Sequence, residues 1–163
     1  MLLFFSTTFA QLMHEQALTQ KYINEIKQKS KQEYVVVVSK TQQKAFLYNV
    51  NGKLVKTYAV STGKKPGQKH RYADYRTPEG IFKIKSIEDC SNWIAIVDNE
   101  ILKYGDYFVR LIGRIGIHGT NQQQALGTRA SQGCIRMKTT SLDSLVEQEI
   151  LKEGYYVVIL PDP

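Results

Sequence analysis

Residues 34–60 read YVVVVSKTQQKAFLYNVNGKLVKTYAV and decide the fold class, because they hold three short runs of β-branched and aromatic residues. The runs cover 34–38, 44–48 and 54–60. Between the second and third runs lies Asn51-Gly52, the dipeptide preferred where both residues of a tight hairpin turn need a positive φ. This stretch therefore predicts strands joined by hairpin turns.

The remainder of the chain continues the same pattern of short β-rich runs. These further runs cover 80–87, 93–97, 107–112, 115–118 and 155–160. Eight short strands with few helical windows favour a sandwich or barrel over alternating strand–helix–strand units. We therefore expect a mainly β fold, a β-sandwich with one N-terminal helix and one late helix.

Two windows show helical periodicity. Residues 11–32 lack Gly and Pro, and their apolar positions recur at helical spacing: Leu18, Tyr22, Ile23 and Ile26. The second window begins near Thr140 or Ser141, either of which can cap a helix, and we expect Gly154 to end it. Its apolar stripe consists of Leu142, Leu145, Val146 and Ile150.

The composition fits one compact domain, with 163 residues of which 42% are hydrophobic and 23% charged. The net charge of +7 favours a polyanionic neighbour, such as nucleic acid, an anionic membrane face or an anionic wall polymer. Nucleic acid is disfavoured, because the sequence has no Arg-rich recognition helix and its basic residues are scattered apart from one loop. The 2 cysteines are too few for a disulfide-built scaffold, and no C-x-x-C pair indicates zinc.

The N-terminal stretch is apolar and free of charge up to Leu12. Thr8-Phe9-Ala10 has the shape of a signal-peptidase site, so we interpret residues 1–10 as a signal-peptide remnant and expect export. The alternative is an apolar N-terminus that packs on the domain. Either way, the stretch is too short to span a membrane.

A long basic segment between residues 61 and 77 is a candidate binding surface. It holds several cations and two aromatic residues: Lys64, Lys65, Lys69, Arg71, Tyr72 and Tyr75. Such a loop is either a substrate-binding surface or a solvated loop. Its length favours a function, because loops of this size without secondary structure are uncommon.

Candidate chemistry is densest between Ile117 and Met137. His118 follows a strand-like run, and Cys134 comes sixteen positions later, a spacing suited to two neighbouring strands joined by a loop. A thiol with a pKa near 8.5 needs such a neighbour, since an imidazole can take its proton and form an ion pair that attacks an acyl carbon. Gly133 allows a close turn in which amide N–H groups face the developing oxyanion. The alternative is an inert buried thiol beside a structural histidine.

Three separated motifs closely resemble the YkuD-type L,D-transpeptidases. They are Ile117-His118-Gly119-Thr120, Ser131-x-Gly133-Cys134-Ile135-Arg136-Met137, and Thr77-Pro78-x-Gly80-Ile81-Phe82. The resemblance extends over residues 33–161, which it identifies as the catalytic domain, preceded by a helix at 11–32.

The resemblance implies an exported bacterial enzyme of the periplasm or cell envelope that acts on peptidoglycan stem peptides without a metal or organic cofactor. Cys134 would attack the stem tetrapeptide after its diamino acid and release the terminal D-residue, and an amine acceptor would take the acyl group. His118 would be the general base and acid. Gly133 and Cys134 would offer oxyanion N–H groups, and Gly119 would belong to the site.

Two residues of the signature have two readings each. Arg136 would meet a substrate carboxylate or make a structural ion pair, and Ser131 would belong to the site or simply shape the turn. The sequence departs from the family at Gln132, where the family often has His, so any help that depends on a charge at this position is lost.

Alternatives remain open for the activity. With water as acceptor, the same acyl-enzyme would make the protein a carboxypeptidase or a hydrolase that detaches wall-linked proteins, and a decayed site would leave a wall-binding module. A Cys90–Cys134 disulfide would make Cys134 structural. We interpret Cys90 as a bystander, because its acidic turn, 88–92, raises the pKa of a thiol.

Overall fold

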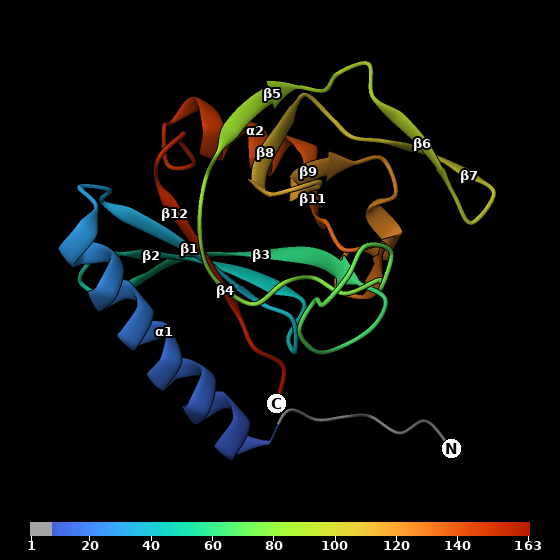
Figure 1. Cartoon of the computed structure of the whole chain (residues 1–163). Coiled ribbons are helices and arrows are strands. Elements are labelled where there is room, and N and C mark those ends of the chain that lie inside the picture. Colours follow the sequence, from blue (N-terminus) through green and yellow to red (C-terminus); the bar gives the residue numbers. More distant parts are fainter. Residues whose placement is uncertain (1–7) are drawn as a thin grey trace.

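The computed structural model describes residues 8–163, and it confirms a mainly β fold with an N-terminal and a late helix (Figure 1). Most of the predicted signal remnant, residues 1–7, lies outside the described residues. The larger sheet has 10 strands in the order β4-β12-β1-β2-β3-β11-β9-β8-β5, with β10 paired to β3 off this path. It curls so that strands from its two halves share one core. A separate two-stranded sheet, β6-β7, projects at the end of the molecule away from the first helix.

The strands are short, as their turns predict. Their bounds are β1 (Tyr34–Ser39), β2 (Lys44–Asn49), β3 (Leu54–Gly63), β4 (Gly80–Lys83), β5 (Ser86–Asp89), β6 (Ile94–Val97), β7 (Glu100–Lys103), β8 (Tyr107–Ile112), β9 (Ile115–Thr120), β10 (Arg129–Ser131), β11 (Ile135–Lys138) and β12 (Tyr156–Leu160). A 3-10 turn at Gln123–Ala125 lies between β9 and β10.

The unbroken valine run of β1 is explained by burial on both faces. Val35 and Val37 pack with Ile23 and Ile26 of the helix α1 (Phe9–Lys29), whereas Val36 belongs to the core between the two halves of the sheet. A strand covered on both faces loses the alternation of apolar and polar residues, because no face meets water. The parallel neighbour of β1, β12, is buried in the same way.

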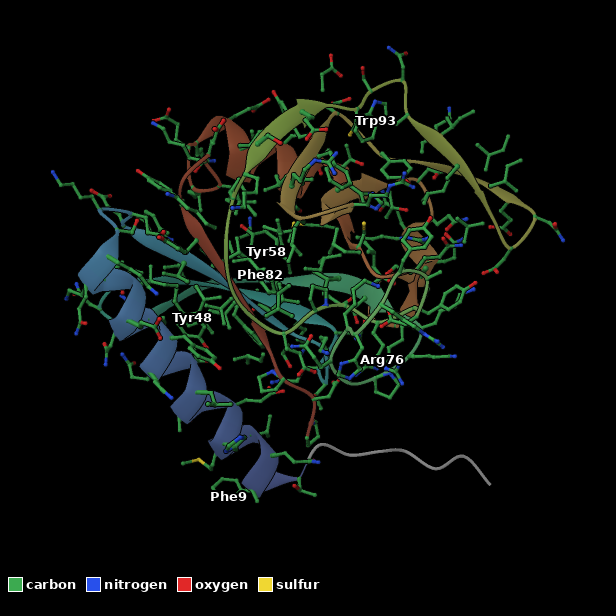
Figure 2. All side chains as sticks on the ribbon, viewed as in Figure 1. Phe9, Tyr48, Tyr58, Arg76, Phe82 and Trp93 are labelled. Carbon is green, nitrogen blue, oxygen red and sulfur yellow. The ribbon has the colours of Figure 1, made fainter. Side chains whose placement is uncertain are left out.

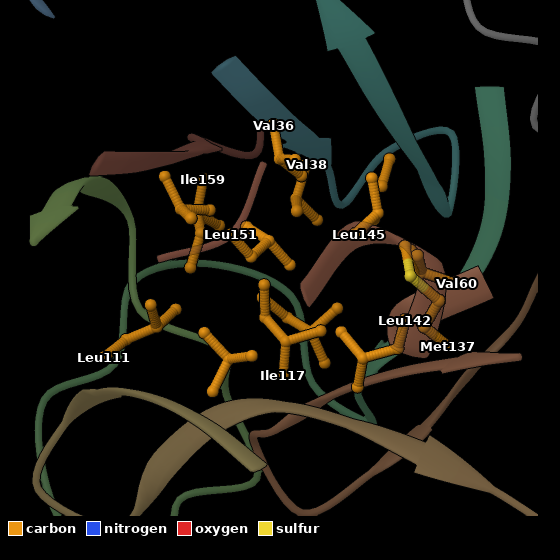
Figure 3. Packing of buried hydrophobic residues seen from close by; sticks show 14 of the residues in the cluster. Val36, Val38, Val60, Leu111, Ile117, Met137, Leu142, Leu145, Leu151 and Ile159 are labelled. Atoms are coloured by element: carbon orange, nitrogen blue, oxygen red, sulfur yellow. The ribbon is translucent and has the colours of Figure 1, made fainter. Parts of the chain in front are cut away.

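The main core joins both halves of the sheet with the second helix, α2 (Thr139–Glu147). In Figure 3, Val36 and Val38 of β1 face the side chains of Leu111 and Ile117 across this core, and Leu142 and Leu145 of α2 close one side. The strands that carry the candidate chemistry, β9 and β11, are thus fixed from behind by tight apolar packing.

The first helix differs from the predicted span of 11–32 at both ends. It begins at Phe9, because Thr8 accepts a hydrogen bond from the Gln11 amide while the Gln11 side chain accepts one from the Thr8 amide. It ends at Lys29, since the buried Gln32 side chain instead hydrogen-bonds backbone groups of β1 and β12. Phe9 lies at the outer end of this helix (Figure 2) and is exposed.

The late helix also begins and ends earlier than predicted. It starts at Thr139 directly after β11, with Lys138 at the N-cap position and no side-chain cap, so the predicted caps at Thr140 and Ser141 are wrong. It ends at Glu147, well before Gly154, because the amides of Ile150 and Leu151 both turn back to the carbonyl of Leu145.

Strand boundaries differ where the chain changes partners. The run at 80–87 is two strands, because the Ile84 amide bonds Tyr155 beside β12 whereas the next amide, of Lys85, bonds Arg110 of β8. The sequence prediction missed β7 and β10, whereas β11 confirms the expected strand beside that of His118. The sequence signal for β7 was the dipeptide Asp98-Asn99, since Asp and Asn tolerate a positive φ. In the structure they take φ values of 54° and 64°, as a two-residue hairpin turn requires.

Candidate active site

The register of β9 and β11 brings the predicted chemistry together. The two strands pair in parallel, with Arg136 opposite His118 and Ile135 opposite Ile117. Because side chains alternate along a strand, Cys134, Arg136 and His118 share one face, and Ile117 and Ile135 share the other and enter the core. The structure thus places residues sixteen positions apart in one site, as the sequence predicts.

This face forms the floor of a cavity of about 260 Å³. Cys134, His118 and Arg136 line it together with Tyr104, and the inner face of the β6-β7 hairpin contributes Val97 and Leu102. The hairpin thus covers one side of the cavity.

His118 is buried, with only 2% of its surface exposed. Its ring stacks on Phe108 at 5.8 Å and lies 4.3 Å from the ring of Tyr104. Its Nδ1 lies 2.6 Å from the carbonyl oxygen of Gly119, which can only accept a hydrogen bond. The tautomer is therefore protonated at Nδ1, and Nε2 is left as the basic nitrogen. Burial lowers the pKa of His118 to about 4.

Cys134 is half-buried, and its Sγ lies 3.5 Å from the carbonyl oxygen of Arg114. Burial raises the pKa of this thiol, and the amide of Gly116 together with nearby cations opposes the rise. Both pKa shifts disfavour charge, so the resting pair is a neutral thiol and a neutral imidazole. This differs from the ion pair expected from the sequence, because the cavity desolvates both groups.

The turn before Cys134 is held by Ser131. Its Oγ accepts the amide hydrogen of Gly133 at 3.0 Å and donates to the carbonyl oxygen of Cys134 at 2.5 Å. The Gly133 amide, expected to face an oxyanion, is therefore occupied within the turn, and Ser131 shapes the backbone. The oxyanion role of the Cys134 amide stays a prediction.

Glycine is required at two positions around this turn. Gly133 has a φ of 138°, and a Cβ there would lie 2.9 Å from the carbonyl oxygen of Arg76. A Cβ on Gly119 would lie 2.5 Å from Thr139 Oγ1. Thr77 also bonds the turn, since its hydroxyl donates to the Gly133 carbonyl at 2.8 Å. The separate motifs around residues 77, 119 and 133 are therefore in contact in the fold.

Arg136 is buried, with 2% exposure, yet it forms no ion pair with any carboxylate in residues 8–163. Its Nη1 donates to Gln122 at 2.9 Å, and its Nε has no hydrogen-bond partner in the same residues. A buried guanidinium without a counter-ion is unfavourable unless a ligand supplies one. Of the two predicted roles, the structural ion pair is therefore not observed in the described part of the chain.

The basic segment is only partly at the site. Tyr72 and Gln132 line the cavity that holds Cys134. Lys64 pairs with Asp98 at the tip of the β6-β7 hairpin, at 2.7 Å, and Lys65 lies over the ring of Tyr75. Lys64, Lys65 and Tyr75 do not line this cavity, so the structure separates them from the nucleophile.

Sequence reasoning missed several residues around Cys134. Tyr104 lies beside His118, and Trp93, Tyr104 and Phe108 form an aromatic cluster next to Cys134 (Trp93 in Figure 2). No motif marks these aromatic residues, because each comes from a different loop or strand and only the fold joins them. Arg114 at the β8–β9 turn also lines the cavity and was not predicted.

Both cysteines are free, so the Cys90–Cys134 bridge does not form in this structure. Burial and nearby carboxylates, among them Asp89 and Asp106, raise the pKa of Cys90 to about 11. This confirms the expected direction of its pKa shift.

From residue 8 onward, no group of three or more His, Cys, Asp and Glu side chains is arranged to hold a metal ion. Neither helix is long and apolar enough to cross a membrane within the same residues.

Comparisons with known proteins agree on one family. The family profile of the L,D-transpeptidase catalytic domain, YkuD, matches residues 33–159. YkuD of Bacillus licheniformis is 33% identical over 129 residues, covering 78% of this chain and 66% of that protein. YqjB of Bacillus subtilis is 33% identical over 148 residues, covering 79% of this chain and 72% of that protein. Both names include L,D-transpeptidase.

Solved structures support the fold assignment. The L,D-transpeptidase from Xylanimonas cellulosilytica superposes with a TM-score of 0.60 at 19% identity, over 80% of this chain and 62% of that chain. The catalytic domain of the E. faecium L,D-transpeptidase gives a TM-score of 0.58 at 20% identity, over 79% of this chain and 98% of that chain. The chain thus spans about two thirds of the first relative and somewhat less of the first structure. On the extent of the family match, this chain belongs to the YkuD family of L,D-transpeptidase catalytic domains.

Proposed function

We propose that this protein is a peptidoglycan L,D-transpeptidase with Cys134 as nucleophile. One observation carries the proposal: Cys134, His118 and the unpaired Arg136 share one face of the β9-β11 pair and line one cavity. A thiol, an imidazole with its basic nitrogen free, and a cation without a counter-ion are the groups that cleavage of an amide near a carboxylate needs.

Acylation begins from the neutral pair. His118 Nε2 takes the proton from Cys134 as Sγ attacks the carbonyl carbon of the diamino acid, which is bonded to the terminal D-residue of a stem tetrapeptide. The C–N bond then breaks, the imidazolium returns the proton to the leaving nitrogen, and the terminal D-residue departs from a thioester. The carbonyl of Gly119 stabilises the imidazolium through Nδ1–H, which offsets part of the cost of burial.

Arg136 suits the terminal carboxylate of that donor peptide. A carboxylate supplies the counter-ion that the buried guanidinium lacks, and Arg can bind it through two parallel hydrogen bonds. Gln122 holds the guanidinium on its other side and is itself bonded to Glu100 of the hairpin at 3.0 Å. Arg136 therefore selects donors with a free carboxyl end.

Deacylation decides between the two enzymatic candidates. An amine attacking the thioester gives a cross-linked product, whereas water gives a tripeptide, as a carboxypeptidase or a wall-protein hydrolase would. We assign the transferase because the family is named for it and because a second cavity adjoins the one that holds the nucleophile, with room for an acceptor. Stem peptides as partners, and action in the periplasm or cell envelope after export, follow from the same proposal.

The nucleophile is tested by mass spectrometry after exposure to a carbapenem. A structure of an L,D-transpeptidase from Mycobacterium tuberculosis carries a faropenem-derived adduct, which supports the choice of a β-lactam probe. We expect one covalent adduct on the native protein, none on Cys134→Ser, and an undiminished adduct on Cys90→Ala. Absence of an adduct on the native protein would favour the wall-binding module.

The reaction is tested with a mixture rich in muropeptide tetrapeptides. A dimer with a 3-to-3 cross-link identifies a transferase, and tripeptide alone identifies a hydrolase. Cys134→Ser gives neither product if the assignment is right, and either product from that variant contradicts it.

A further inference from the structure

A second and larger cavity, of about 480 Å³, adjoins the one that holds Cys134. Its lining includes Arg71 and Tyr72 of the basic segment and Arg114 of the β8–β9 turn. Four residues line both cavities and form their shared edge: Tyr72, Arg114, Ile115 and Gln132. Gln132 is only two positions before Cys134. A molecule in the larger cavity therefore lies within reach of an acyl group on the thiol.

The charge of this cavity is positive, and no Asp or Glu lines it. Lys69 also lines it but is neutralised by the buried Asp74, at 2.7 Å. Arg71 and Arg114 form no ion pair with any carboxylate between residues 8 and 163. Two guanidinium groups therefore carry the uncompensated charge.

The position of Arg114 is fixed by Tyr72. Its guanidinium lies 5.7 Å from the centre of the Tyr72 ring, and its Nη1 lies 3.5 Å from the tyrosine hydroxyl. Its backbone carbonyl meanwhile faces Cys134 Sγ. Arg114 thus presents a pre-oriented planar donor at the shared edge, which costs less ordering on binding than a free side chain.

We propose that this cavity is the acceptor subsite and that Arg71 and Arg114 select amines whose molecule also bears a carboxylate. The proposal rests on the proposed function, because it needs an acyl-enzyme on Cys134. The donor carboxylate has its own partner in Arg136, which lines the smaller cavity but not the larger one. The two cavities thus divide donor and acceptor between them.

The positive charge also favours the reaction itself. An amine attacks only in its neutral form, and nearby cations lower the pKa of an ammonium group. The amine nitrogen bonds to the thioester carbonyl carbon, the C–S bond breaks, and the sulfur leaves as a thiolate. The surplus proton of the nitrogen passes to His118 and then to Cys134. The carboxylate anchors the acceptor while the amine is kept deprotonated.

The experiment is a competition between two acceptors for one acyl-enzyme. A stem peptide with a free C-terminal carboxylate and its C-terminal amide are supplied at equal concentration, and the two cross-linked products are quantified by mass spectrometry. Because both acceptors share the same acyl-enzyme, the product ratio does not depend on the acylation rate. The variant is Arg71→Gln/Arg114→Gln, and the control is Lys44→Gln, an exposed residue of β2.

We expect the native protein and Lys44→Gln to prefer the carboxylate acceptor by about tenfold or more, and the double variant to bring the ratio close to one. Equal use of both acceptors by the native protein, a ratio unaltered in the double variant, or hydrolysis alone would each overturn the acceptor subsite. Absence of any thioester on Cys134 would instead overturn the proposed function, and these results are distinguishable in the same mass spectra.

Discussion

His118 shows how burial changes the chemistry that a motif suggests. The motif pairs a thiol with an imidazole, whose unperturbed pKa near 6.5 would leave part of it protonated near neutral pH. The stacked rings of Phe108 and Tyr104 remove water from the imidazole, so its pKa falls to about 4. An imidazole that is neutral at rest is therefore a consequence of the fold.

This pKa predicts the pH dependence of acylation. His118 accepts a proton only when neutral, so the rate of carbapenem acylation should stay level from neutral pH downward and fall as pH drops through about 4. A solvent-exposed imidazole, with its ordinary pKa of 6.5, would instead lose activity through that higher value. Stopped-flow measurement of the acylation rate across this range distinguishes the two, and an inflection near 6.5 would contradict the burial argument.

The lowered pKa of His118 can also be tested without substrate, through the pH dependence of the free energy of unfolding. Between pH 6.5 and about 4 the unfolded chain binds a proton on this residue and the folded chain does not. The free energy of unfolding should therefore decrease as pH falls through this window. His118→Asn should remove that part of the decrease in urea titrations.

At this scale the sequence identifies residue types better than environments. Cys134 and His118 could be predicted because a nucleophile and a base must occur together. The roles of Gly133 and Arg136 could not be predicted. The Gly133 amide donates to Ser131 Oγ, and Arg136 pairs with no carboxylate among the described residues. Those are facts about partners, which local sequence does not encode.

Among the elements, the β6-β7 hairpin is the one whose strands do not pair with the main sheet. It forms a sheet of its own, and it exposes Ile94, Ile96 and Ile101. Its inner face, with Val97 and Leu102, covers the cavity of Cys134. Its turn depends on Asp98 and Asn99, both in the left-handed region.

Asn99→Val should loosen the hairpin without unfolding the protein. A β-branched residue at a φ of 64° is strained by about 1–2 kcal/mol, and this strain is released by local opening. We expect faster amide exchange in 94–103 and several-fold slower acylation, with little change in the urea midpoint. Asn99→Gly, which tolerates this φ, should match the native protein, and equal acylation rates in both variants would count against a role for the hairpin.

The elements also show where sequence patterns stop. Runs with turn residues between them predicted the early strands well, because hairpins are local. Splitting of 80–87 into β4 and β5 was not predictable, since it arises where one run leaves β12 and joins β8. The short strand β10 was missed because its three residues, Arg129–Ser131, lie among the polar and glycine residues that lead to the turn at Cys134.

For the whole molecule, one buried ammonium connects segments that are far apart in sequence. The Lys40 side chain is fully buried, and its Nζ contacts Glu79 Oε1 at 2.6 Å and Asp162 Oδ2 at 3.1 Å. It also donates to the carbonyl oxygens of Gly67 and Thr77. The basic segment, the strand β1 and the last residues of the chain are therefore held at one point.

Lys40→Met should destabilise the protein by about 3–5 kcal/mol, because it leaves the Glu79 carboxylate without its cation and Asp162 with Arg129 alone. Urea unfolding measures the change. Adding Glu79→Gln should recover part of the loss by removing one of those charges, whereas Lys44→Met, at an exposed position, should change the stability by less than about 0.5 kcal/mol. A Lys40→Met protein as stable as the native one would show that the network contributes nothing.

The parallel pairing of β1 with β12 also determines how the molecule can fold. Val36 lies opposite Val157, so this pair, which lies near one edge of the sheet, joins the first strand to the last strand. Closing so long a loop is entropically costly, and proteins rich in such distant contacts fold slowly. Until the final strand arrives, β1 offers an unpaired apolar edge of the kind that other chains can join. The sheet therefore stays incomplete until β12 is synthesised, and this is the interval in which the chain is most exposed to aggregation.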